Sequence, residues 1–187
     1  MMPQGMARAE GRQGRAARVL TVANALSASR IPLAFLFAAV GDPRVRLVVL
    51  GSAAATDLLD GWTARRFGPS SLGAAVDPVA DKVFYLTAFV VLGLSGSLGL
   101  LEVLGVLLRD ILTPVGYLAS VVARRPFTTP ARAGGKAVTV GQCLTLCAWL
   151  LDSPLLRPLA WATAAMALYA LWDYGRLAVR RAETPND

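Results

Sequence analysis

This chain of 187 residues contains no histidine and only two cysteines. Without histidine the commonest general base is excluded, so a carboxylate or a less usual group must take that role. Cys143 and Cys147 lie four residues apart in an apolar stretch, a pattern typical of small packing residues on one helix face. Neither a disulfide framework nor a zinc site has support in this pattern.

Charged residues are also sparse, at 17%, whereas 55% of the chain is hydrophobic. This balance is too apolar for an ordinary soluble domain of this size. The sequence shows neither the alternating pattern of β-strands nor an internal repeat. In lipid, a helix satisfies its own backbone hydrogen bonds. We therefore expect an all-α protein, built as a six-span transmembrane helical bundle.

Six apolar stretches have the length needed to cross about 30 Å of hydrocarbon. The predicted spans are residues 19–40, 46–65, 74–94, 98–122, 137–152 and 158–179. Turn formers such as Gly41-Asp42-Pro43 separate them. The spans form one membrane domain over residues 19–181, followed by a tail at 182–187. Residues 1–18 hold four arginines with no apolar core before them. They are predicted to form a basic juxtamembrane segment with a short amphipathic surface helix rather than a signal peptide.

Arginine and lysine are distributed unevenly along this map. With the N-terminus in the cytoplasm, thirteen of the nineteen basic residues lie on the cytoplasmic side and three lie outside. Membrane proteins carry this excess in their cytoplasmic loops. The bias predicts a multi-pass protein with both termini and the active site facing the cytoplasm, and we expect the membrane to be a bacterial inner membrane. The bias also explains the net charge of +7 through membrane orientation and anionic lipid, so a nucleic-acid partner is not needed.

Four aspartates gather near the cytoplasmic ends of the second and third stretches. Asp57 and Asp60 are three residues apart, and Asp77 and Asp81 are four apart, so each pair shares a helix face. A short turn joins the two helices, which would bring the four carboxylates together. Such a cluster needs cations to remain ionised, and Mg²⁺ or Mn²⁺ would suit carboxylate and phosphate oxygens. The pattern favours two divalent metal ions that clamp a phosphoryl group. A purely structural network of acids and bases is the alternative.

The spacing of these aspartates resembles the signature of the CDP-alcohol phosphatidyltransferase family. All eight fixed positions match in the pattern Asp57-x-x-Asp60-Gly61-x-x-Ala64-Arg65, seven residues, and then Gly73-x-x-x-Asp77-x-x-x-Asp81. A further stretch of the family is similar to Asn24-x-x-Ser27-x-x-Arg30, with serine replacing the family's threonine. The family also has six spans, with the signature across the second and third, so the resemblance covers most of the chain.

The resemblance implies an enzyme of phospholipid biosynthesis, a phosphotransferase for substituted phosphate groups. It would transfer a phosphatidyl group from CDP-diacylglycerol to an alcohol and release CMP. The metal ligands would be Asp57, Asp60, Asp77 and Asp81, and Asp81 would also be the general base. The CDP-diacylglycerol site would contain Asn24, Ser27, Gly61, Arg65, Ser71 and Gly73, with the guanidinium of Arg65 at the pyrophosphate. A homodimer is also implied.

The acceptor is not identified by the signature. Arg109 and Lys136 resemble positions at which members that use glycerol phosphates bind an anionic acceptor, and Arg132 would assist them. Glycerol 3-phosphate and phosphatidylglycerol are the two leading acceptors, and the Arg109-Asp110 pair leans toward the second. Inositol phosphate is a further alternative. Outside the enzyme class, a six-span metal-ion transporter would need acids spread through the membrane depth, whereas these acids gather at one face.

Overall fold

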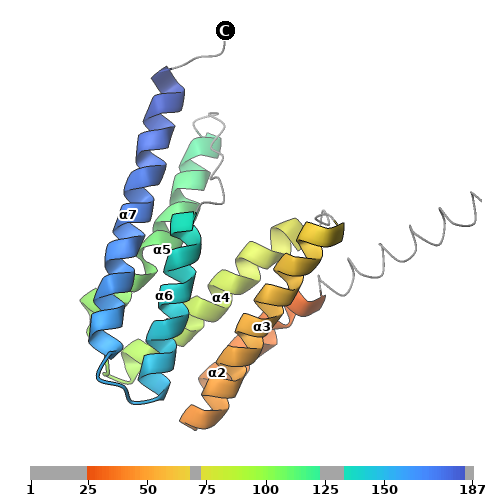
Figure 1. Cartoon of the computed structure of the whole chain (residues 1–187), viewed down its shortest axis with the longest axis vertical. Helices are drawn as coiled ribbons and strands as arrows, with labels where there is room; N and C mark the ends of the chain where they lie inside the picture. The colour runs from red at the N-terminus through yellow and green to blue at the C-terminus, as the bar shows by residue number, and fades with distance from the viewer. Residues whose placement is uncertain (1–24, 68–72, 123–132, 184–187) are drawn as a thin grey trace, which may run out of the picture. The chain divides into compact units, whose positions relative to one another are not determined.

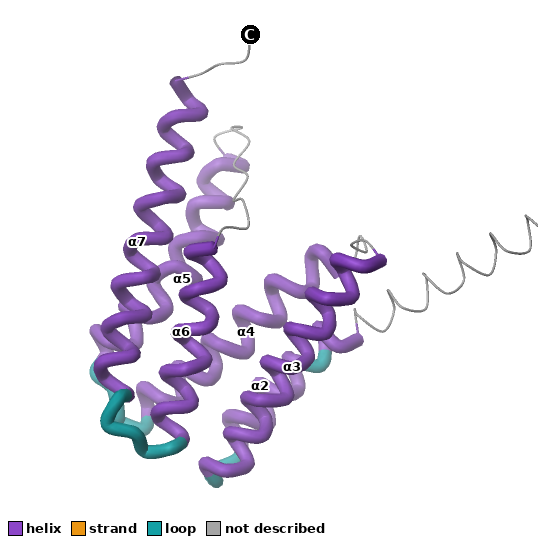
Figure 2. The backbone as a smooth tube through the Cα atoms, in the orientation of Figure 1, coloured by secondary structure: helices purple, strands orange, loops and turns teal. Residues whose placement is uncertain are grey.

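The computed structural model describes residues 25–67, 73–122 and 133–183, and helices dominate all three ranges (Figure 1). The helices are α2 (Arg30–Ala39), α3 (Pro43–Phe67), α4 (Gly73–Leu94), α5 (Leu100–Val122), α6 (Ala133–Leu150) and α7 (Leu156–Glu183). Figure 2 shows the helices joined by loops, with no strand in the described part of the chain. The predicted all-α class is therefore confirmed.

Local signals explain where the helices begin and end. Asp42 caps α3, because its Oδ1 accepts a hydrogen bond from the backbone N–H of Arg44 at 2.7 Å, and Pro43 takes the first helical position. Gly96, between α4 and α5, has φ of 74°, which glycine adopts without a steric penalty. The predicted limits of the second, third and fourth stretches lie within three residues of those of α3, α4 and α5. The first stretch is predicted to begin at residue 19, whereas α2 begins at Arg30, and residues 19–24 lie outside the described residues. The last two helices also differ from the prediction, since α6 begins at Ala133 rather than at residue 137 and α7 ends at Glu183 rather than at residue 179.

Other parts of the prediction are not settled by these helices. None of the helices in the described ranges is both long and apolar enough to cross a membrane. The six-span transmembrane character therefore stays a prediction. The expected surface helix at residues 1–18 lies outside the described residues, as do residues 184–187 of the expected tail.

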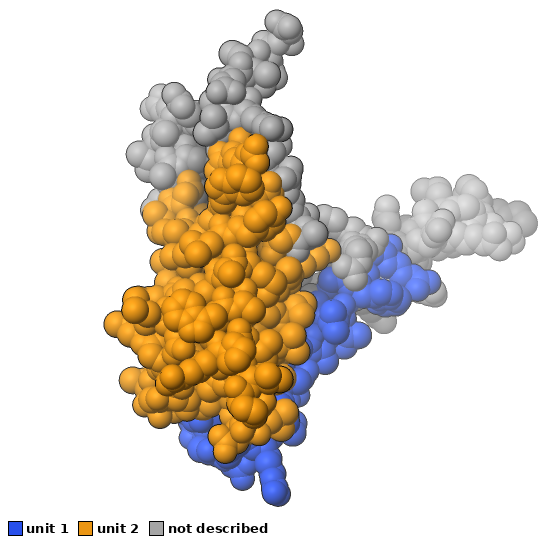
Figure 3. Space-filling model, turned by 60° about the vertical axis from the view of Figure 1, so that its left-hand side comes forward, with its two compact units in different colours: residues 1–88 blue, residues 89–187 orange. Residues whose placement is uncertain are grey.

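The chain divides into two compact units, Met1–Ala88 and Phe89–Asp187, which Figure 3 colours separately. In the first unit α2 packs against α3, and two contacts show that they are antiparallel. Arg46, near the start of α3, donates through Nε to the carbonyl oxygen of Phe37 near the end of α2, at 3.1 Å. Arg30, at the start of α2, pairs with Asp57 in the second half of α3. Phe84 of α4 meets Phe37 edge to face, with ring centroids 5.8 Å apart.

In the second unit α7 packs against both α5 and α6, and small residues permit the close approach. A Cβ added at Gly105 of α5 would come within 3.0 Å of the Cβ of Ala164. A Cβ added at Gly141 of α6 would come within 2.6 Å of the Oγ1 of Thr163. Such glycines let helix backbones lie close together. The result is a tight three-helix unit that fixes α5 and α6 through their shared partner.

Candidate active site

The signature residues lie on two consecutive helices of the first unit. Asp57, Asp60, Gly61 and Arg65 are on α3, and Gly73, Asp77 and Asp81 are on α4. The side chains of Asp60, Arg65 and Asp77, and the surroundings of Gly73, lie outside the part of the chain that the structure describes. Asn24 and Ser71 lie outside the described residues altogether. The convergence of all four carboxylates therefore stays a prediction.

Asp57 is fixed by a partner on another helix. Its Oδ1 lies 3.3 Å from the Nη2 of Arg30. The side chain of Arg30 is 2% exposed, whereas that of Asp57 is 49% exposed. The buried stripe of α3 runs through Ala53, and Asp57 follows one helical turn later on the same face. The carboxylate is thus held from its buried side while its other side remains accessible.

Sequence reasoning did not assign a role to Arg30. The available signal was its place in the Asn24-x-x-Ser27-x-x-Arg30 stretch, together with its charge inside an apolar segment. Ser27 is fully buried and lies three residues before Arg30, just ahead of α2. Asp81 and Gly61 are both half-buried. The described residues thus place Ser27 and Arg30 in the interior and leave Asp57 partly open.

The donor chemistry of the signature fits a hard divalent cation. All four predicted ligands are aspartates, whose carboxylate oxygens such ions prefer, and the carboxylate of Asp57 is half-exposed. Among the described side chains, no three Asp, Glu, Cys or His residues gather as a metal site. Asp60 and Asp77 are outside that set. The donor set is therefore suitable, and the metal site stays a prediction.

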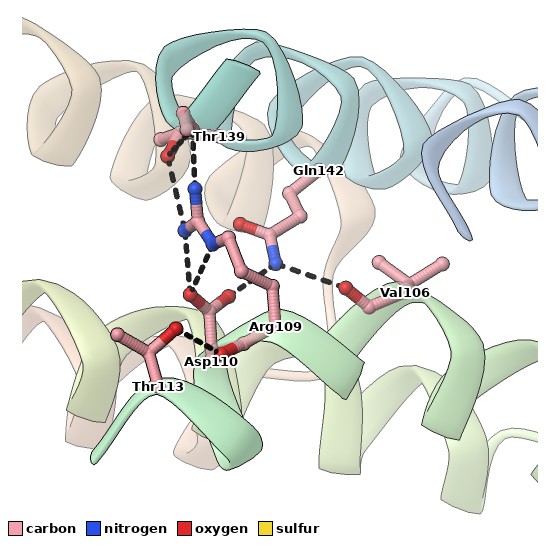
Figure 4. A network of polar contacts seen from close by, with 7 residues as sticks. Val106, Arg109, Asp110, Thr113, Thr139 and Gln142 are labelled. Carbon is pink, nitrogen blue, oxygen red and sulfur yellow. Dashed lines mark hydrogen bonds and ion pairs between the residues drawn. The ribbon is translucent and has the colours of Figure 1, made fainter. Parts of the chain in front are cut away.

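The second unit contains a polar cluster that joins α5 to α6 (Figure 4). The Nε of Arg109 donates to Oδ1 of Asp110 at 3.0 Å, and Nη2 donates to the same oxygen. Nη1 donates to the carbonyl oxygen of Gly135. Gln142 is buried and donates through Nε2 to Oδ2 of Asp110. Arg109 and Asp110 are 14% and 13% exposed, so the pair is shielded from solvent.

The predicted acceptor residues have different environments. Arg109 is engaged inside the protein, whereas Lys136 is exposed in the first turn of α6, next to Gly135. Arg132 lies outside the described residues. Sequence reasoning missed Gln142, and its signal was an amide in an otherwise apolar stretch. The structure thus brings Arg109 to the residue that precedes Lys136.

Comparisons with known proteins agree with the signature. The model of the family described as CDP-alcohol phosphatidyltransferase matches residues 16–172. A Mycobacterium tuberculosis protein named "Putative cardiolipin synthase" is 34% identical, over 87% of this chain and 83% of its own. The "Cardiolipin synthase (CMP-forming)" of Streptomyces coelicolor is 32% identical, over 95% and 90% respectively. A "Probable phosphatidylglycerophosphate synthase" of Mycobacterium tuberculosis is 30% identical, over 83% and 77%.

Proposed function

Because the chain belongs to the CDP-alcohol phosphatidyltransferase family, we propose that it transfers a phosphatidyl group from CDP-diacylglycerol to phosphatidylglycerol, forming cardiolipin. The chain is a phosphatidyltransferase enzyme, since the family model covers most of it and its relatives are synthases. The metal-ion transporter alternative is therefore set aside. The acceptor rests on one observation: relatives named as cardiolipin synthases match over most of the chain, at 34% and 32% identity.

In the proposed reaction, the hydroxyl oxygen of the acceptor attacks the phosphorus that carries diacylglycerol. A new oxygen–phosphorus bond forms, the bond from that phosphorus to the bridging oxygen breaks, and CMP leaves with the electron pair. Asp81 receives the proton of the acceptor hydroxyl, a role open to a carboxylate in a chain without histidine. Arg65 holds the pyrophosphate of the donor, for which its guanidinium fork is suited. Ser27, Gly61 and Gly73 belong to the same donor site.

We assign Asp57, Asp60, Asp77 and Asp81 as ligands of two divalent metal ions, Mg²⁺ or Mn²⁺. When bound, such ions neutralise charge on the transferring phosphoryl group. The protein's part is to supply oxygen donors from two helices of one unit. Arg30 supports this assignment, because it holds one of these donors in a defined position.

The proposed setting is a membrane, since both the donor and the product are lipids. Large apolar side chains are exposed on helices of both units, including Phe35 on α2, Leu101 on α5 and Leu168 on α7. Soluble monomers rarely expose extensive apolar patches, so these surfaces support contact with lipid. The charge bias favours a cytoplasmic position for the termini and the active site. A homodimer, implied by the family resemblance, belongs to the same proposal.

Glycerol 3-phosphate is the second candidate acceptor. It is favoured by the relative named as a phosphatidylglycerophosphate synthase, at 30% identity. Both candidates carry a phosphate, so the same basic residues could recognise either one. No described contact favours inositol phosphate.

A product assay tests the proposal. Purified protein is incubated with Mg²⁺ and CDP-diacylglycerol carrying a labelled diacylglycerol, together with phosphatidylglycerol, glycerol 3-phosphate or inositol phosphate. Labelled cardiolipin, with CMP released in equal amount, is the expected result. Labelled phosphatidylglycerophosphate would instead establish the second acceptor. The absence of a labelled product with any acceptor would contradict the proposed reaction.

A further inference from the structure

The guanidinium of Arg109 is occupied within the protein. An arginine has five N–H donors, and the described contacts use four of them. Two donate to Asp110, one to the carbonyl oxygen of Gly135, and one points to the Oγ1 of Thr139 at 3.5 Å. Asp110 also compensates the positive charge. An anionic acceptor would therefore have to compete with a carboxylate that is already in place.

These contacts fix α6 against α5 at two levels (Figure 4). The first level is Gly135, in the first turn of α6, whose carbonyl oxygen is held by Arg109. The second is Gln142, whose Nε2 donates to Asp110 and, at 3.2 Å, to the carbonyl oxygen of Val106. Gln142 lies seven residues, about two turns, after Gly135. Two attachment points on one helix restrict both its rotation and its sliding.

The exposed residue beside the first attachment point is Lys136. Its backbone follows the carbonyl that Arg109 holds, so the position of Lys136 depends on the cluster. A lysine ammonium is a compact point charge suited to a phosphate. Lys136 therefore has the exposure that an anion-binding residue needs, whereas Arg109 has a compensated charge and little exposure.

We propose that Arg109 is a positioning residue, which with Asp110 and Gln142 fixes the first turn of α6 so that Lys136 contacts the phosphate of the acceptor. This inference rests on the proposed transfer to an anionic acceptor. It reassigns Arg109, which the sequence predicts to bind the acceptor directly. Lys136 alone keeps that role among the described residues.

Asp110→Asn separates the two roles of Arg109, because they predict opposite signs. If Arg109 positions α6, the substitution weakens the cluster and raises the KM for the acceptor, by roughly tenfold if one charge-assisted contact is lost. If Arg109 binds the acceptor itself, the substitution releases its guanidinium and removes a repelling carboxylate, so that KM falls. The KM for CDP-diacylglycerol should remain unchanged. A lower acceptor KM in Asp110→Asn would overturn the inference.

A second arm uses Lys136→Gln, Arg109→Gln and the double variant, with phosphatidylglycerol and glycerol 3-phosphate as acceptors. Because Arg109 acts through Lys136, the double variant should have the acceptor KM of Lys136→Gln alone. If the increases in acceptor KM of the two single variants multiplied in the double variant, Arg109 would have its own contact with the acceptor, and the inference would be overturned. Thr113→Val is the matched control, since that hydroxyl donates to the backbone carbonyl of Arg109 and makes no described contact with its guanidinium.

Folding and the underlying function are checked separately. Thermal unfolding is recorded for every variant, and Asp110→Asn, which keeps the size of the side chain, decides the matter if Arg109→Gln fails to fold. A wild-type protein that uses neither anionic acceptor would overturn the proposed function and this inference together. A wild-type protein that uses one of them, with a lower acceptor KM in Asp110→Asn, would overturn the inference alone.

Discussion

The buried guanidinium of Arg30 lies 3.3 Å from the carboxylate of Asp57, which is the first aspartate of the family signature. The two partners differ in environment, because the side chain of Arg30 is 2% exposed and that of Asp57 is 49% exposed. Water can therefore replace Arg30 as a partner of Asp57, but it cannot readily replace Asp57 as a partner of Arg30. The pair is asymmetric in what each half contributes to stability.

This asymmetry predicts that Asp57→Ala destabilises the protein more than Arg30→Met does. Removing Asp57 takes a partner from a buried charged donor, at a cost on the order of 1–3 kcal/mol. Arg30→Met removes the buried charge itself, and replacing buried ionic groups by apolar ones is often nearly neutral. Thermal unfolding in detergent with a chelator present measures both without any contribution from metal.

Two further variants complete that comparison. In the Arg30→Met background, Asp57→Ala should lose most of its effect, since the buried charge with which Asp57 pairs is then absent. Arg44→Met serves as a control at an exposed arginine of the same unit. Equal destabilisation by Asp57→Ala in both backgrounds would show that the two side chains are not coupled.

Metal removal gives the second prediction. Four carboxylates on α3 and α4 need cations to act together on a phosphate, so excess chelator should abolish phosphatidyl transfer. Addition of Mg²⁺ or Mn²⁺ beyond the chelator should restore it. Chelator already saturated with Mg²⁺ is the control and should leave activity intact. Full turnover in excess metal-free chelator would contradict the two-metal assignment.

Local features of the sequence predicted the boundaries of α3, α4 and α5 to within a few residues, whereas contacts between helices escaped prediction. The Asp42-Pro43 pair and Gly96 act within a few residues, and the structure uses them as a cap and a turn. Asp57, which forms an ion pair with Arg30, lies 27 residues after it in the chain. This pairing depends on which faces of α2 and α3 meet, and a single sequence does not show this.

The polar cluster of the second unit illustrates the same limit. Its charges were visible in the sequence as an Arg109-Asp110 pair inside an apolar stretch. Its other members, Gly135 and Gln142, are on α6. They reach Arg109 and Asp110 only because of the position of α6 along α5. An arginine inside an apolar stretch predicts a functional role. Whether it binds a ligand or another helix is decided by packing that the sequence does not encode locally.

Helix packing in the second unit gives the third prediction. Gly141→Ala should destabilise the protein by about 1–3 kcal/mol, the usual cost of overpacking. The new Cβ would lie 2.6 Å from Oγ1 of Thr163 and 2.9 Å from Cε of Met166, so the buried side chain of Thr163 or the helix that carries it would have to shift. Gly116→Ala is the control, because a Cβ there meets nothing within 4 Å. It should be neutral or slightly stabilising, as alanine favours helix more than glycine does. Thermal unfolding of the two variants compares them, and a Gly141→Ala protein as stable as the control would contradict the close packing.

The fourth prediction separates the roles of two aspartates in the signature. Asp81→Asn keeps an oxygen and nearly the same volume but cannot accept a proton from the acceptor hydroxyl. With metal and CDP-diacylglycerol saturating, transfer should fall by roughly 10²–10⁴-fold, which is the usual contribution of a general base. Asp57→Asn should instead weaken metal binding first, so that raised Mg²⁺ recovers part of the activity. Calorimetry of Mn²⁺ binding, recorded beside product formation, keeps the two effects apart, since part of the loss in Asp81→Asn also comes from weaker metal binding. If Asp81→Asn turned over near the wild-type rate at saturating metal, Asp81 would not be the base, and in a chain without histidine another carboxylate would have to take the proton.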